Sequence, residues 1–161
     1  MKTMEKTQKT TIENTRFGKL EADPATFINF NEGVYGFPRA KNFLLIETGK
    51  DSDFRWLQSV EDPALAFLVT DPTLFYPDFR AAVDKEHPLV AAMADDYQLL
   101  AIVTVDRPTR KVTVNLAAPL AVHINRREGC QLILSREGLS TQHDLIKDFR
   151  DSFAKDCQGK V

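Results

Sequence analysis

The 161-residue sequence is poor in cysteine, histidine and glycine, with two, three and seven of them respectively. Two cysteines cannot build a disulfide scaffold, and both are expected to stay reduced in a cytoplasm. The longest apolar runs reach six or seven residues, as in Ala64–Val69, whereas a membrane span needs about 18. The first residues include no apolar stretch, so no secretory signal is expected. These absences favour a soluble cytoplasmic domain that does not enter a membrane.

Motifs for metal binding and catalysis are also absent. The three histidines lack the helical spacing of a zinc site, and no two cysteines stand in a C-x-x-C arrangement. Ser59 has no glycines of a nucleophile elbow around it, and Gly33 and Gly36 are too few to cradle a phosphate. We therefore expect no enzyme activity, no metal and no cofactor. The alternative is a small-molecule-binding β-barrel or an enzyme whose site is assembled from scattered polar residues.

Short apolar segments separated by turn signals make up most of the chain. Apolar residues amount to 43% of the sequence, which is enough for the core of one domain. The spacing of about ten residues predicts a mainly all-β fold, an antiparallel barrel or sandwich with short connections. The expected strands lie near residues 26–30, 43–46, 54–60, 66–70, 97–105, 111–115, 120–124 and 131–134.

One amphipathic helix is expected near the end of the chain. Ser140 and Thr141 precede an acidic residue in the manner of a capping box. Apolar residues then recur on one helical face, at Leu145, Ile146, Phe149 and Phe153. Residues 81–85 allow a further short helix. We therefore divide the chain into a flexible tail over residues 1–11, a barrel domain over 12–136, and a terminal helix and tail over 137–161.

Charge is nearly balanced over the whole chain but not along it. There are 21 lysines and arginines against 23 acids, a formal net charge of −2, which argues against direct binding to nucleic acid. Residues 47–96 carry eleven acids and four bases, so this stretch has a net charge of −7. It is either a solvated acidic surface or a surface complementary to a basic partner.

Five strings, in order along the chain, resemble those of the FliW family of bacterial flagellar assembly factors. They are FNEGVYGF at residues 30–37, LQSVEDP followed by LAF at 57–67, DPTLFYPDF at 71–79, TVNLAAPL at 113–120 and GCQLIL at 129–134. The resemblance covers roughly residues 12–136. Three features depart from the family pattern. Phe79 replaces a tyrosine, His123 stands where asparagine is common, and Gly138-Leu139-Ser140 follows Leu134 where an aromatic residue is expected.

The resemblance implies a non-enzymatic regulator built on a small antiparallel β-barrel. FliW-like proteins bind CsrA, a dimeric RNA-binding repressor of translation, and thereby relieve the repression of flagellin mRNA. They also bind flagellin, so the two proteins compete in a partner-switching loop. The implied partners of this chain are therefore CsrA and flagellin, without direct contact to nucleic acid or membrane.

The acidic stretch supplies a hypothetical dock for the basic CsrA. Two aromatic residues within it are the type of anchor that interfaces favour, although core packing is the competing interpretation for Phe75. Asn115 either satisfies backbone groups at a bulge or contacts a partner, and Pro119 either ends a strand ladder or contacts a partner. His123 would make binding depend on pH if it lies in the interface. The complete predicted site is Glu61, Asp62, Asp71, Phe75, Tyr76, Asp78, Asn115, Pro119 and His123.

Overall fold

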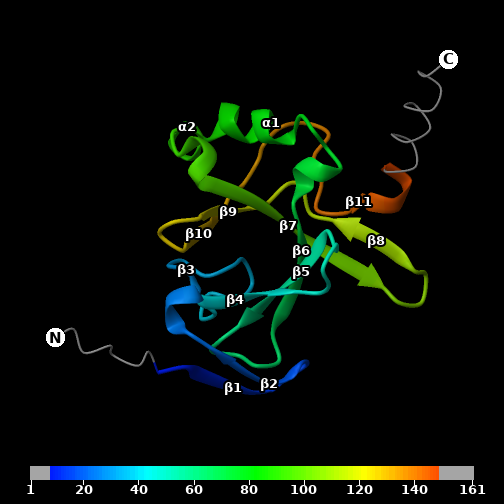
Figure 1. Ribbon diagram of the computed structural model, residues 1–161. Helices are drawn as coiled ribbons and strands as arrows, with labels where there is room; N and C mark the ends of the chain where they lie inside the picture. The colour runs from blue at the N-terminus through cyan, green and yellow to red at the C-terminus, as the bar shows by residue number, and fades with distance from the viewer. Residues whose placement is uncertain (1–7, 149–161) are drawn as a thin grey trace.

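The computed structural model describes residues 8–148 and shows a mainly β protein with short α-helices (Figure 1). The strands are β1 (Thr10–Thr15), β2 (Gly18–Ala22), β3 (Ile28–Phe30), β4 (Asn42–Glu47), β5 (Phe54–Ser59), β6 (Ala66–Thr70), β7 (Tyr97–Asp106), β8 (Lys111–Val114), β9 (Leu120–His123), β10 (Glu128–Gln131) and β11 (His143–Asp144). The helices are α1 (Phe79–Glu86) and α2 (Pro88–Ala91), with 3-10 turns at Pro24–Thr26, Pro72–Leu74 and Ala94–Asp96.

Seven of these strands close into a barrel in the order β3, β4, β5, β6, β7, β9, β10 and back to β3. The predicted antiparallel pairing holds throughout except between β3 and β10, which run parallel at Asn29 and Phe30. Gly129 makes this approach possible, because a Cβ atom there would lie 2.5 Å from the ring of Phe30. The mainly all-β barrel is therefore confirmed, and its pairing is mixed at the closing seam. Strands β8 and β11 extend the sheet beyond the barrel from one edge of β7.

Strand β7 is buried on both faces, and its alternation separates two apolar cores. Leu100 and Ile102 belong to the core inside the barrel, where they meet residues of β3, β4 and β5. Leu99 and Ala101 point the other way, into a second core shared with α1, α2 and the segment after β10. Successive side chains of a strand point to opposite faces, so β7 is the wall between the two cores.

A helical layer covers the outer face of β7, above the barrel in Figure 1. Helix α1 includes the residues expected to allow a helix, and it buries Phe79, Ala82 and Val83 at helical spacing. It ends at His87, whose backbone leaves the helical region because a proline follows. The guanidinium of Arg80 lies 4.0 Å from the ring centroid of Tyr97 and donates to the carbonyl of Ala94. These contacts fix α1 to the start of β7.

The C-terminal helix begins later than the sequence indicated. Residues 145–148 are helical, and Oδ1 of Asp144 caps this turn by accepting from the amide of Lys147 at 3.0 Å. The capping box expected at Ser140 and Thr141 is wrong, because the Ser140 hydroxyl instead accepts from the amide of Gln142, and β11 pairs with β8. Phe149 and Phe153 lie outside the described residues.

Strands β1 and β2 form a separate hairpin beneath the barrel (Figure 1). It begins at Thr10, inside the stretch expected as a tail, and residues 1–7 lie outside the described part of the chain. Arg16 holds the hairpin to the barrel, since its guanidinium stacks 4.1 Å from the ring centroid of Trp56 on β5. Phe17 meets the same indole edge-on at 5.6 Å.

Truncation of Leu100 tests the inner core. The side chain is 1% exposed, so Leu100→Ala should lower the free energy of unfolding by about 2–5 kcal/mol through lost burial and a cavity. Val105→Ala on the same strand is the control, because Val105 is 50% exposed and its loss should cost no more than about 0.5 kcal/mol. Urea denaturation of both variants measures the difference, and equal losses would contradict this description of β7.

Candidate partner-binding groove

A groove of about 400 Å³ lies between the start of α1 and the C-terminal segment. One wall comes from the turn that leaves the 3-10 helix Pro72–Leu74 and enters α1, and the other from the segment that leads to β11. We call it the C-terminal groove. Its lining residues are Phe75, Tyr76, Pro77, Asp78, Phe79, Ala82, Leu116, Arg136, Gly138, Leu139 and His143.

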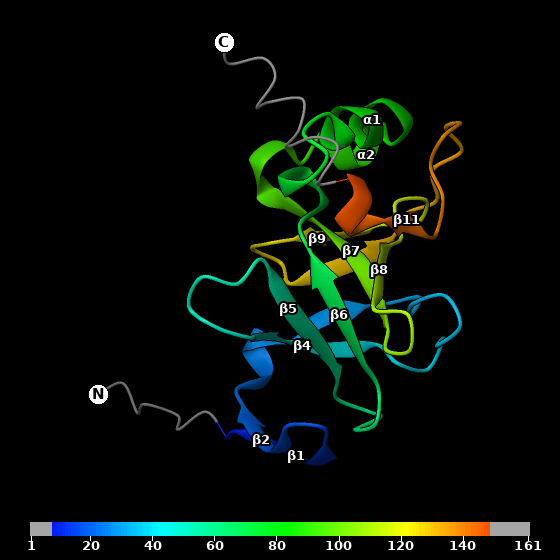
Figure 2. The ribbon, with the colours of Figure 1, turned by 90° about the vertical axis from the view of Figure 1, so that its right-hand side faces the viewer.

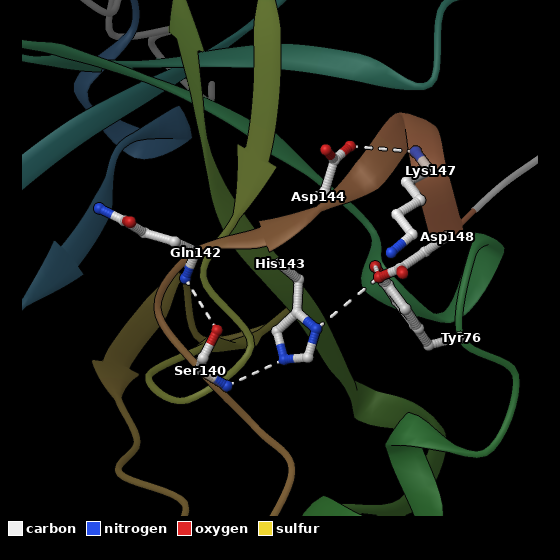
Figure 3. A network of polar contacts seen from close by, with 7 residues as sticks. All are labelled: Tyr76, Ser140, Gln142, His143, Asp144, Lys147 and Asp148. Carbon is white, nitrogen blue, oxygen red and sulfur yellow. Dashed lines mark hydrogen bonds and ion pairs between the residues drawn. The ribbon is translucent and has the colours of Figure 1, made fainter.

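Polar contacts tie the two walls of the C-terminal groove together (Figure 3). The hydroxyl of Tyr76 donates to Oδ2 of Asp148 at 2.5 Å, and Nδ1 of His143 lies 3.7 Å from the same oxygen. Nε2 of His143 accepts from the amide of Ser140 at 2.9 Å. Burial, followed by the hydrogen bond to Asp148, raises the pKa of Tyr76 well above its ordinary value. Tyr76 therefore stays protonated at physiological pH and keeps donating to Asp148.

The aromatic pair predicted as anchors is half-buried in this groove. Phe75 packs against the outer core and lies 6.3 Å, ring to ring, from Phe54 on β5. Tyr76 packs against the same core and meets the imidazole of His143 at 6.1 Å. Each ring thus combines a structural contact with a position on the groove wall. Core packing and an interface role are both compatible with this placement.

Two of the predicted aspartates flank these rings but differ in their surroundings. Asp71 is half-buried and caps the 3-10 helix, because its Oδ1 accepts from the amide of Thr73 at 2.9 Å and from the Thr73 hydroxyl at 2.6 Å. Asp78 is exposed at the start of α1 and makes no side-chain capping bond. The Asp78 carboxylate is therefore the better placed of the two to meet a partner's cation.

Asn115 and Pro119 stabilise the loop between β8 and β9, which carries Leu116. Oδ1 of Asn115 accepts from the amide of Ala118 at 3.0 Å, while buried Pro119 accepts from the amide of Leu132 at 2.8 Å. Leu116, between them in the chain, lines the C-terminal groove. Both residues therefore satisfy backbone groups of, or next to, the loop between β8 and β9.

His123 lies away from the groove, at the end of β9. It pairs with Tyr97 and Glu128 across the sheet, and its Nδ1 accepts from the amide of Arg126 at 3.2 Å. The imidazole therefore stabilises the turn between β9 and β10.

The remaining predicted pair, Glu61 and Asp62, lies in the turn that precedes β6, whereas the segment that enters the C-terminal groove follows β6. Figure 2 shows this turn at the end of β6 that is farther from α1. Both residues are exposed in the turn between β5 and β6. The carboxylate of Glu61 accepts from the backbone amide of Asn42 at 3.0 Å and from its side-chain amide at 2.9 Å. The predicted residues thus divide into two groups at the two ends of one strand.

Sequence reasoning missed the C-terminal wall of the groove, which includes Leu139 and His143, and it missed Asp148, which accepts from Tyr76. These residues follow the last family-like string, and Tyr76 and Asp148 are 72 positions apart. A hydrogen bond over such a separation leaves no local pattern, so only the fold reveals it.

Within residues 8–148, no helix is long and apolar enough to cross a membrane. Over the same residues there is no cluster of three histidine, cysteine or acidic side chains that could hold a metal ion.

Comparison with known proteins identifies the family of this chain. The family model described as FliW protein matches residues 10–145. The chain belongs to the FliW family. The flagellar assembly factor FliW of Magnetococcus marinus is 40% identical over 149 residues, which is 90% of each chain. FliW 2 of Desulfotalea psychrophila is 37% identical over 133 residues, covering 81% of this chain and 87% of its own.

A solved structure agrees with these sequence relatives. The crystal structure of a flagellar assembly factor FliW superposes with a TM-score of 0.73 at 29% identity. The match covers 84% of this chain and 96% of the solved chain. The mixed β-barrel of this protein is therefore the fold of a FliW protein, and the chain is a flagellar assembly factor by family.

The hydrogen bond between Tyr97 on β7 and Asp84 on α1 can be tested at alkaline pH. Tyr97 is 1% exposed and its hydroxyl donates to Asp84; burial and then this bond raise its pKa to about 12. Unfolded tyrosine titrates near pH 10, so the stabilisation is complete below about pH 10 and is lost as pH rises towards about 12.

Tyr97→Phe should therefore lower stability at neutral pH by about 1 kcal/mol or more, because a buried hydrogen bond to a carboxylate is lost. It should also reduce the decline in stability between about pH 10 and pH 12. Urea denaturation at a series of pH values measures both effects. An unchanged decline in the variant would contradict the assignment to Tyr97.

Proposed function

We propose that this FliW-family protein is a non-enzymatic cytoplasmic regulator that binds CsrA and antagonises it, relieving repression of flagellin mRNA. We propose further that it binds flagellin, so that the two partners compete for it. The observation that best supports a protein-binding role is the C-terminal groove, where half-buried Phe75 and Tyr76 adjoin the exposed carboxylate of Asp78. Aromatic anchors beside a charged rim are typical of protein interfaces.

Charge supports a basic partner. Six of the eleven residues that line the groove belong to the stretch of residues 47–96, with its net charge of −7, and Arg136 lines the opposite wall. A hollow lined by Asp71 adds Glu47 and Asp53 against Arg55. An RNA-binding repressor presents a basic surface, and complementary charge of this kind steers association. We therefore centre the proposed CsrA dock on Phe75, Tyr76 and Asp78, with Asp71 beside it.

The packing of the barrel interior does not favour the alternative of a ligand-binding barrel. The barrel interior is filled by apolar side chains that are at most 1% exposed, including Phe30, Phe43, Leu57, Leu100 and Leu120. A small ligand would therefore have to bind outside the barrel core.

Charge reversal at Asp78 tests the dock. We expect Asp78→Lys to weaken CsrA binding roughly fivefold at low salt, since an exposed ion pair contributes about 1 kcal/mol or less and a reversed charge adds repulsion. The difference should shrink near 0.15 M salt, roughly, because exposed charges are screened there. Calorimetric titration of the purified protein with CsrA at both salt concentrations measures it.

Glu13→Lys is the matched control, because it changes the net charge equally at an exposed position of β1. It should leave CsrA affinity within about twofold of the unmodified protein. Equal effects of the two variants would exclude a specific dock at Asp78, and no binding by the folded, unmodified protein would overturn CsrA as a partner.

Competition between partners gives the second test. Saturating flagellin should lower the apparent affinity for CsrA, and saturating CsrA should lower that for flagellin by the same factor, since linkage is reciprocal. Titrations with and without the other partner measure both factors. Unchanged affinities would show independent binding and contradict partner switching.

A further inference from the structure

A second hollow, of about 480 Å³, lies at the other end of β6 from the C-terminal groove. Its apolar part is made by Phe37, Pro38 and Leu65, and its rim includes Glu61, Asp62 and Arg39. Phe37 remains 41% exposed although its ring meets Phe67 edge-on at 5.4 Å. We call this hollow the turn pocket, because two turns form its walls.

Consecutive turns make the first wall rigid. The amides of Gly33, Phe37 and Ala40 donate to the carbonyls of residues 30, 34 and 37, at 2.8, 2.7 and 3.1 Å. Gly33 has a φ of +70°, and a Cβ atom there would lie 2.8 Å from the Phe37 carbonyl. Only glycine therefore permits this path, which presents Phe37 at the pocket.

The second wall is held from inside by Gln58, which is fully buried. Its side-chain amide donates to the carbonyls of Ser59, Pro63 and Leu65 at 3.0, 3.0 and 3.1 Å. The amide of Asp62 donates to the Ser59 hydroxyl at 3.0 Å. Both walls are thus ordered before any partner arrives, which lowers the entropic cost of binding.

The rim carries negative charge that the described part of the chain does not neutralise. Glu61 accepts hydrogen bonds from the neutral groups of Asn42, and Asp62 accepts from the amide of Ala64 at 3.1 Å. Neither carboxylate forms an ion pair within residues 8–148. Arg39 supplies one positive charge against the two carboxylates, so a cation beside the apolar floor would be favoured.

We propose that the turn pocket is a second docking surface, which receives an apolar side chain of a protein segment with a lysine or arginine next to it. The apolar side chain would cover Phe37, Pro38 and Leu65, and the cation would face Asp62 and Glu61. This surface is distinct from the C-terminal groove and does not depend on the binding of CsrA there.

Two synthetic peptides test this proposal on the full-length protein, Gly-Gly-Phe-Lys-Gly-Gly and Gly-Gly-Phe-Glu-Gly-Gly, both with blocked termini. Amide chemical shifts in two-dimensional NMR report where each peptide binds and how tightly. The lysine peptide should saturably shift the amides of the non-proline residues among 36–40 and 61–65 and leave those among 75–79 unmoved. It should bind roughly fivefold more tightly than the glutamate peptide.

Asp62→Asn should reduce that preference to about twofold or less, because it removes the charge but keeps the side-chain oxygen that accepts from Ala64. Glu13→Gln, at an exposed position of β1 outside both surfaces, is the matched control and should leave the preference intact. Equal affinity for both peptides, shifts centred elsewhere, or no saturable shift would each overturn the proposal. Because CsrA is absent from these titrations, they succeed or fail independently of the proposed function.

Discussion

The two-sided burial of β7 is the constraint on which the rest of this structure depends. One face of the strand completes the barrel interior with Leu100 and Ile102, and the other supports the helical layer with Leu99 and Ala101. The outer core extends from that second face to Phe75, Tyr76 and Leu139, which line the C-terminal groove. The proposed interface is thus an exposed margin of the outer core, and damage to β7 would disturb the groove as well as the barrel.

Local periodicity predicted the strands β3 to β9, because alternation and Asp-Pro boundaries are properties of neighbouring residues. The strand expected at residues 131–134 was wrong, since β10 runs from Glu128 to Gln131 and residues 132–134 are not in a strand. Closure of the barrel depends on contacts between distant strands, so the parallel pairing of β3 with β10 left no local sign. Ser140 shows how tertiary contacts override a capping pattern. Its carbonyl accepts from the amides of Leu116 and Ala117, and β11 then pairs with β8 where the helix was expected.

The predicted site residues differ in whether their side chains already accept a hydrogen bond from a nearby backbone amide. Asp71, Asn115 and His123 each accept from a backbone amide a few positions along the chain. Such local capping explains a polar residue at a turn without any partner. Asp78 has no such capping bond. Residue type could not separate these cases, because the separation depends on backbone geometry that forms only in the fold.

Family-like strings distant in the chain prove to be physically joined. Oε1 of Gln131 accepts from the amide of Tyr35 at 2.8 Å, and its Nε2 donates to the carbonyl of Ala118 at 3.0 Å. One glutamine thus connects the strings at residues 30–37, 113–120 and 129–134. The turn that carries Phe37 is therefore fixed to the loop that carries Leu116, a residue of the C-terminal groove. The turn pocket and the C-terminal groove lie at the two ends of β6, which is about 15 Å long at roughly 3.3 Å per residue. A standard protein interface buries about 800 Å² on each partner, so it extends farther than this strand. A large protein partner would therefore contact both surfaces at once, whereas a short segment would occupy only one of them.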